Sequence, residues 1–398
     1  MLFSLSLIFL VGLSASSICK KIRLPGLVGM LVTGIILGPF ILDLIDPSVL
    51  NISAELRKAA LIIILIRAGL SLNLSDLKKV GRPAILMSFV PATFEIIGYI
   101  VFAPVFLGLS HIEAAVLGAV LAAVSPAVVV PRMIKLTEEN RGTGRGIPQL
   151  ITAGASCDDI FVIVLFSVFV GMAQGGKPQV SDFLKIPVSV CLGISVGAAV
   201  GFLLFYFFET AHKKGGTIRN SVKVIIILAV SFLFAAAETL LENKIPFSGL
   251  LAVMGTACVL GMKFSKNVTA RLSEKFGKIW IAAEILLFVL VGAAVDIRYT
   301  LEAGLPAIAL IFTALIFRAA GVFVCLIKTP LTFKERLFCV IAYLPKATVQ
   351  ASIGSVPLSM GLACGNTVLS VAVLSILITA PLGAFGIDMS SKRLLNKE

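Results

Sequence analysis

Long apolar stretches alternate with short polar loops along the whole chain. Thirteen such stretches can be marked in its 398 residues, and most approach the about 20 residues that a helix needs to cross a bilayer. The pattern therefore predicts an all-α polytopic membrane protein with about 13 transmembrane helices and no soluble domain. The stretches cover roughly residues 2–19, 25–45, 56–72, 83–109, 112–134, 148–173, 183–209, 222–241, 246–262, 276–296, 304–327, 336–355 and 364–387.

Composition supports a membrane protein and argues against several other classes. The chain is 58% hydrophobic and only 14% charged, whereas soluble domains have about 45–50% apolar and about 25% charged residues. Its mean hydropathy is +1.06. The two histidines, His111 and His212, lie far apart, and the seven cysteines form no C-x-x-C pair. We therefore expect neither a histidine metal site nor a disulfide framework, and we expect no cofactor.

The lysines and arginines predict the orientation of the chain. Of the 34 bases, 25 lie at or after the ends of stretches 1, 3, 5, 7, 9 and 11 or in the C-terminal tail. Another 6 lie in the opposite loops, and 3 lie at membrane depth. Short cytoplasmic loops carry most bases in membrane proteins. We therefore expect a multi-pass protein of the cell membrane with its N-terminus outside and its C-terminus in the cytoplasm. The net charge of +13 is then a sign of topology and not of nucleic-acid binding.

Two similar stretches lie seven apolar segments apart. Residues 123–131 read Ala-Val-Ser-Pro-Ala-Val-Val-Val-Pro, and residues 342–350 read Ala-Tyr-Leu-Pro-Lys-Ala-Thr-Val-Gln. Because seven is odd, the two copies would cross the membrane in opposite directions, as in inverted-repeat transporters. We therefore expect a single transmembrane domain with one repeat at about 1–174, a linker helix at about 183–209 and a second repeat at about 222–387.

Prolines within these two stretches predict discontinuous helices. Pro126 and Pro345 each remove a backbone N–H donor in the middle of an apolar segment. Ser125 and Lys346 stand directly beside them. Irregular backbone is tolerated at membrane depth only inside protein or beside water, so two crossed broken helices would line an ion site. Two ordinary proline kinks are the alternative.

Two adjacent acids lie inside the sixth apolar stretch. Asp158 and Asp159 would each cost roughly 2.5–3.5 kcal/mol or more at bilayer depth, which favours a functional role over a purely structural ion pair. Protons and a small cation such as sodium or lithium could compete for the two carboxylates. Ser125 and Ser156 could add oxygen ligands to this cation and proton site. We assign the pair no enzymatic chemistry.

Other charges at membrane depth suggest fixed partners for these acids. Glu95 and Arg318 are expected to form a structural ion pair between the fourth and eleventh segments. Lys346 could neutralise the end of a half-helix or pair with one aspartate. Arginine stays protonated in proteins, so Arg318 cannot carry the exchanged proton. If a base such as Lys346 holds one aspartate ionised, the other alternates between one proton and one cation, and exchange is electroneutral.

Four stretches resemble the monovalent cation:proton antiporter-2 family. They are residues 65–70, 118–131, 153–160 and 344–354. The resemblance is strongest to the branch that contains animal mitochondrial and plasma-membrane sodium/proton antiporters and their bacterial relatives. It implies a homodimer in which a core domain moves against a dimerisation domain, with sodium or lithium ions and protons as substrates.

The resemblance also carries over to single residues. It implies that Asp158 and Asp159 form the family's ion-binding pair, that Ser125 and its neighbour Pro126 lie at the unwound crossover, and that Glu95 pairs with Arg318. Other family members have lysine at the position of Arg318.

Several functions remain open on sequence alone. We favour secondary active sodium or lithium/proton antiport by alternating access. Potassium/proton antiport, a gated ion channel and a sodium-coupled symporter are the transport alternatives. An intramembrane aspartyl protease needs two aspartates on different helices, whereas Asp158 and Asp159 are adjacent.

Overall fold

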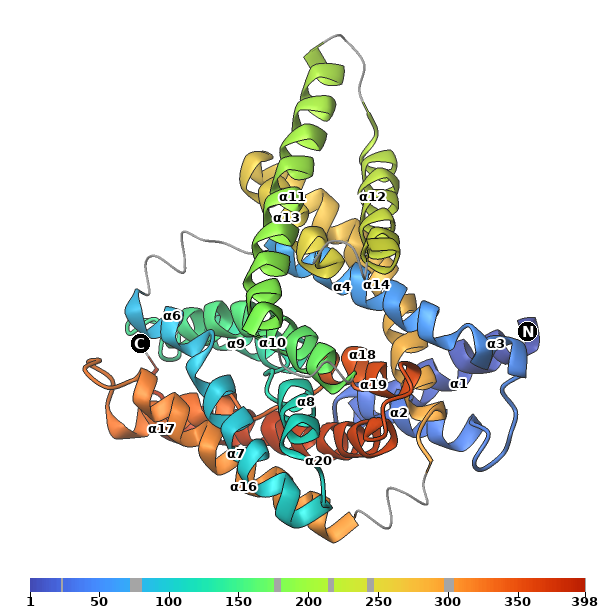
Figure 1. The fold of residues 1–398 in the computed structure, drawn as a ribbon. Helices are drawn as coiled ribbons and strands as arrows, with labels where there is room; N and C mark the ends of the chain where they lie inside the picture. Colours follow the sequence, from blue (N-terminus) through green and yellow to red (C-terminus); the bar gives the residue numbers. More distant parts are fainter. Residues whose placement is uncertain are drawn as a thin grey trace. The chain divides into compact units, whose positions relative to one another are not determined.

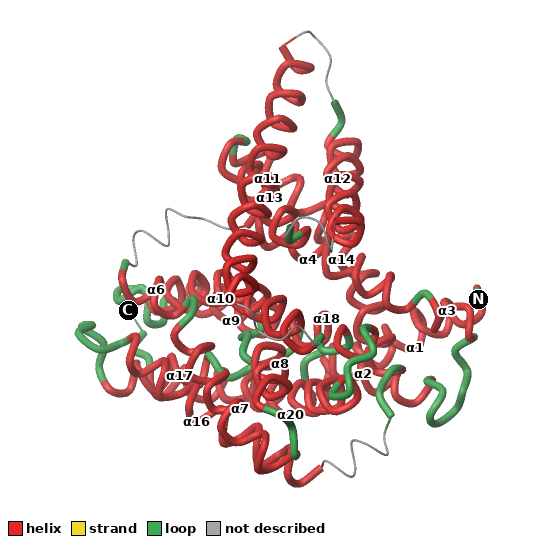
Figure 2. Tube along the Cα trace, in the orientation of Figure 1, coloured by secondary structure: helices red, strands yellow, loops and turns green. Residues whose placement is uncertain are grey.

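Helices are the main regular structure in the part of the chain that the structure describes. The computed structural model describes residues 1–22, 24–71, 81–174, 180–213, 218–241, 247–296 and 304–397. Within these ranges extended backbone pairs only at an isolated bridge between Arg141 and Lys397. Figure 2 shows the helices joined by loops and turns. The predicted all-α class is confirmed.

The helices divide into two compact units, each built from separate stretches of the chain. Unit 1 comprises Met1–Ala54, Leu74–Gly175 and Leu287–Glu398, and unit 2 comprises Glu55–Asn73 and Gly176–Leu286. The helices of unit 1 are α1 (Leu2–Lys21), α2 (Gly26–Leu37), α3 (Pro47–Asn51), α6 (Arg82–Met87), α7 (Val90–Leu107), α8 (His111–Leu121), α9 (Pro126–Glu138), α10 (Ile147–Ala173), α16 (Gly304–Cys325), α17 (Phe333–Ala342), α18 (Thr348–Ile353), α19 (Val356–Ser359) and α20 (Gly365–Leu394). Unit 2 contains α11 (Val180–Lys213), α12 (Asn220–Leu241), α13 (Gly249–Lys263) and most of α4 (Ser53–Ser71) and α14 (Lys266–Ala293).

Each of the thirteen predicted stretches contains one helix or a pair of helices within the described residues. Nine described spans are long and apolar enough to cross a membrane, and two shorter apolar helices accompany them. The number of membrane crossings, the repeat boundaries and the linker helix stay predictions.

The fourth predicted stretch, 83–109, differs from the expected single helix. It is divided into α6 and α7 at Ser88 and Phe89. Pro91 lies in the first turn of α7, where its missing N–H costs no intrahelical hydrogen bond. The proline therefore starts a new helix instead of kinking a continuous one.

The first interrupted helix is the pair α8 and α9. Ser110 and Glu113 form a capping box that starts α8, which ends at Leu121. Four non-helical residues follow, and Pro126 opens α9. The break falls at the predicted proline, within the stretch predicted to be discontinuous.

The second interrupted helix is the pair α17 and α18. Thr332 and Glu335 form the capping box of α17, and the helix ends at Ala342. The chain is then non-helical around Pro345 until α18 begins at Thr348. Both predicted discontinuous helices are therefore present.

Hydrogen bonds join the two breaks directly. The Ser125 amide donates to the Pro345 carbonyl at 2.8 Å. The buried side chain of Gln350 donates to the carbonyls of Ala123, at 2.8 Å, and Leu121, at 3.3 Å. Interrupted helices expose polar backbone groups, and an unpaired buried one costs free energy comparable to a lost hydrogen bond. Each break thus satisfies groups of the other, and α8, α18 and α20 pack together here (Figure 1).

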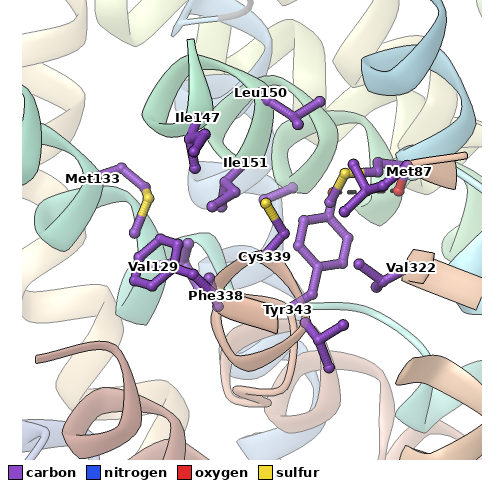
Figure 3. Close-up of a cluster of buried hydrophobic side chains, with 14 of the residues drawn as sticks. Met87, Val129, Met133, Ile147, Leu150, Ile151, Val322, Phe338, Cys339 and Tyr343 are labelled. Atoms are coloured by element: carbon purple, nitrogen blue, oxygen red, sulfur yellow. Dashed lines mark hydrogen bonds between the residues drawn. The ribbon is translucent and has the colours of Figure 1, made fainter. Parts of the chain in front are cut away.

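An apolar cluster supports the breaks from one side. Met133 of α9, Ile147 and Ile151 of α10, and Phe338 of α17 are among its buried members. Figure 3 shows these side chains pointing toward one another, with Tyr343 beside them. The cluster therefore holds both interrupted helices against α10, the helix of the acid pair.

Unit 2 is packed through small residues. A Cβ at Gly197 of α11 would overlap the backbone of Ala252 in α13. The Thr256 hydroxyl of α13 donates to the Gly197 carbonyl at 2.8 Å. Close helix approach through small residues and interhelical hydrogen bonds is typical of membrane helices.

Candidate functional site

The acid pair lies in the middle of α10 and is withdrawn from solvent. Asp158 is 0% exposed and Asp159 is 8% exposed. Neighbouring helix residues point about 100° apart, so the two carboxylates face different directions. Asp158 Oδ2 accepts from the Val124 amide, in the first break, at 2.8 Å. One acid is therefore fixed to the interrupted helix α8–α9.

Arg318 of α16 links this acid to a second one. Its Nη2 lies 3.1 Å from Asp158 Oδ2, and its Nη1 lies 2.8 Å from Glu95 Oε2 of α7. All three side chains are 0% exposed. The guanidinium also donates to the carbonyls of Ala122 and Tyr343, one beside each break. The predicted contact between Glu95 and Arg318 is present, but Arg318 is also a direct partner of the acid pair.

Lys346 lies in the second break and binds Glu95. Its Nζ is 2.6 Å from Glu95 Oε2, and its amide donates to Thr379 Oγ1 at 3.0 Å. The sequence left open whether Lys346 neutralises a half-helix end or pairs with an aspartate, and the structure gives it the glutamate instead. The base that holds an aspartate is Arg318 and not, as suggested above, Lys346. Arg318 can reach Glu95 because α7 and α16 lie side by side (Figure 1).

Formal charges within this group cancel. Two bases, Arg318 and Lys346, contact two acids, Glu95 and Asp158. Among the described residues no base lies within ion-pair distance of Asp159. Burying an unpaired charge is costly unless a cation or a proton neutralises it. Asp159 is thus the one carboxylate of the described site without a fixed counter-charge.

Several buried oxygen atoms of the site have no hydrogen-bond partner. They are Asp158 Oδ1, Asp159 Oδ1, Glu95 Oε1 and the Ser125 hydroxyl. Buried polar atoms are almost always paired, and the exceptions include sites that take an ion or water. Oxygen donors suit hard cations. The side chain of Ser156 lies outside the described residues, so its predicted ligand role stays a prediction.

The described residues contain no cluster of three or more His, Cys, Asp or Glu side chains arranged to hold a metal ion.

Sequence reasoning missed three contributors to the site. They are the Val124 amide, the Gln350 side chain and the bond from Arg318 to Asp158. Charge counting could have revealed the last, because adjacent buried acids need a base and Arg318 is one of few at membrane depth. Nothing in the sequence could have placed the backbone amide.

Two interrupted helices that meet beside a buried acid pair are typical of secondary transporters built from inverted repeats. The sequence matches the family described as "Sodium/hydrogen exchanger, transmembrane" over residues 5–389. The chain belongs to this family, which confirms the resemblance found in its motifs.

Similar curated proteins agree with this assignment. Human sodium/hydrogen exchanger 9B2 is 33% identical over 414 residues, which cover 100% of this chain and 75% of that protein. The 9B2 protein of Xenopus tropicalis is 35% identical over 99% of this chain and 74% of its own length. Human sodium/hydrogen exchanger 9B1 is 31% identical over 100% of this chain and 78% of its own length.

A solved structure has the same fold. The sodium proton antiporter MjNhaP1 from Methanocaldococcus jannaschii superposes with a TM-score of 0.83 and covers 98% of this chain and 97% of its own. Its sequence is 20% identical, so it supports the fold alone.

The ion-pair network predicts a strong stability effect at Glu95. Replacing Glu95 with glutamine removes the negative charge that Arg318 and Lys346 share, and Lys346 then has no described acid partner. Breaking a buried ion pair by removing one partner typically costs about 3–5 kcal/mol. Glu95→Gln should therefore lower the melting temperature of the purified protein in detergent markedly, with transport partly retained by the folded fraction.

Glu274→Gln is the matched control for this measurement. Glu274 pairs with Lys278 at 2.8 Å on an exposed helix surface, where water and salt screen the pair and its contribution to stability is small. Equal melting temperatures for the two variants would show that Glu95 does not stabilise the fold.

Proposed function

We propose that the protein is a secondary active antiporter that exchanges sodium or lithium for protons by alternating access. The observation that carries the proposal is the buried carboxylate of Asp159, which has no counter-charge among the described residues and lies next to the fixed acid Asp158. Family membership supports the same conclusion, because the relatives compared above are named sodium/hydrogen exchangers. No cofactor or enzymatic step is needed.

Competition for one carboxylate couples the two ions. Asp159 can be neutralised by a proton or by a cation, but not fully by both at once. Asp158 Oδ1, Asp159 Oδ1 and the Ser125 hydroxyl are buried oxygens that could replace part of the water shell of a small cation. Either ion removes the free-energy cost of the buried charge. The loaded site can therefore switch its access from one side of the membrane to the other, whereas the empty charged site cannot.

Charge balance makes the exchange electroneutral in this proposal. Asp158 stays ionised in each state because Arg318, which remains protonated, holds it. Glu95 and Lys346 likewise neutralise each other. Only Asp159 changes its occupant, so one proton is exchanged for one sodium ion.

We further propose that unit 1 carries the bound ion. Asp158, Asp159, Ser125, Glu95 and the bases that hold them all belong to unit 1. This agrees with the family resemblance, which implies a core domain that moves against a dimerisation domain within a homodimer. An external N-terminus and a cytoplasmic C-terminus in the cell membrane complete the proposal.

Asp159→Asn should abolish exchange. Asparagine keeps the shape of the side chain but can neither bind a proton nor attract a cation with a full charge. Cation-driven proton flux should be measured in proteoliposomes with lithium, sodium and potassium. The elution volume in size-exclusion chromatography checks that the variant is folded. Asp43→Asn, at an exposed position outside the site, should exchange as the parent does. Parental sodium/proton exchange by Asp159→Asn would rule out the assignment of the carrier.

Competition predicts how cation affinity depends on pH. As pH falls, protons occupy Asp159 and less of the site is free for sodium. The KM for sodium should therefore rise on the order of tenfold per pH unit on the acid side of the pH at which the site is half protonated, since one pKa unit corresponds to about 1.4 kcal/mol. Initial rates should be measured across sodium concentrations at several pH values. A KM that stays flat while only the maximal rate changes would contradict competition.

A further inference from the structure

Tyr343 lies at the end of α17, where the second interrupted helix breaks, and it is 0% exposed. Its hydroxyl donates to the Met87 carbonyl of α6 at 3.2 Å. Figure 3 shows the ring directed toward Met87, with Val322 of α16 and Cys339 of α17 on its two sides. The side chain is thus fixed at its tip as well as along its ring.

The same residue contacts the Arg318 guanidinium in two ways. The central carbon of the guanidinium lies 5.3 Å from the centroid of the Tyr343 ring, within the range of a cation–π contact. The Tyr343 carbonyl accepts from Arg318 Nε. A guanidinium has five N–H donors in a rigid plane, so a carbonyl at one edge and a ring beside it restrict both its position and its tilt.

Tyr343 also lies against the helix of the acid pair. A Cβ at Gly154 of α10 would overlap the Tyr343 hydroxyl. Gly154 and Asp158 are four residues apart and so lie on one face of that helix. The tyrosine therefore fills the space one turn before Asp158 and touches the base that holds Asp158.

We propose that Tyr343 is a positioning residue of the ion site, which sets the Arg318 guanidinium where it neutralises Asp158 and leaves Asp159 alone to take the proton or cation. This inference rests on the function proposed above. Glu95 and the Ala122 carbonyl hold Arg318 Nη1. Tyr343 contacts the guanidinium through its ring and through its carbonyl, which accepts from Nε, while Nη2 reaches Asp158.

Losing the Tyr343 ring should change the number of protons that the ion site binds. Without it, Arg318 keeps Glu95 but is free to turn away from Asp158. Asp158 would then become a second buried carboxylate without a fixed counter-charge and would bind a proton of its own. Titratable groups near Tyr343 include Asp158, Cys157, Cys325 and Cys339, besides Arg318. Near Asp158 the remaining charges are Asp159 and Lys346.

Tyr343→Phe and Tyr343→Leu separate the ring from the hydroxyl. Phenylalanine keeps the ring beside Arg318, and leucine removes it. The KM for sodium should be measured against pH in proteoliposomes for the parent and both variants. In the parent and in Tyr343→Phe, KM should rise on the order of tenfold per pH unit on the acid side, because one proton competes. In Tyr343→Leu the rise should approach a hundredfold per pH unit, because two protons compete.

Gly154→Ala provides a second test that does not remove the ring. Its Cβ should displace the tyrosine through the hydroxyl and give the steeper pH dependence seen with leucine. Adding Tyr343→Phe removes the overlapping oxygen and should return the slope toward that of the parent. This variant decides the question on its own if Tyr343→Leu does not fold.

The outcomes distinguish this inference from the function on which it rests. A parental slope in both Tyr343→Leu and Gly154→Ala, with losses only in maximal rate or melting temperature, would overturn the role of Tyr343 and leave the antiport proposal intact. A KM for sodium that is independent of pH in the parent protein would instead overturn the proposed competition itself.

Discussion

The free-energy cost of burying a charged carboxylate away from water governs this structure. Four charged side chains, Glu95, Asp158, Arg318 and Lys346, are buried together, and each acid contacts at least one base. These contacts tie α7, α10, α16 and the second break into one body. Because their charges cancel, the neighbouring acid Asp159 is left with a charge that no described base neutralises. The same arrangement is the basis for our proposal that a mobile cation or proton binds at Asp159.

The pairing of backbone groups at the two helix breaks is the second consequence of excluding water. Each break leaves backbone groups without helical partners, and these groups bind each other and the charged cluster. The Val124 amide reaches Asp158, while the Ala122 and Tyr343 carbonyls accept from Arg318. In the proposed function, ion binding at Asp159 would therefore act on both breaks through these contacts and could couple to a conformational change.

Much of this arrangement could be predicted from residue order. Apolar stretches between polar loops located the helices, and Pro126 and Pro345 located the breaks, because proline has a fixed local effect on helices. The pairing of Glu95 with Arg318 followed from the scarcity of charges at membrane depth. The Val124 amide as a partner of Asp158, the glutamate partner of Lys346 and the division of 83–109 could not be predicted. They depend on which helices touch and on side-chain direction, and the sequence does not encode either in a local pattern.

The most direct test of the account measures whether exchange moves net charge. Sodium-driven proton flux should be recorded in liposomes whose membrane potential is set by potassium and valinomycin at zero or at about 100 mV, where moving one elementary charge changes the free energy by about 2.3 kcal/mol. If Asp159 alone alternates between one proton and one sodium ion, the flux reverses where the two ion gradients match, at either potential. A reversal point that shifts with voltage would contradict the account, because a second group would then release a proton during exchange.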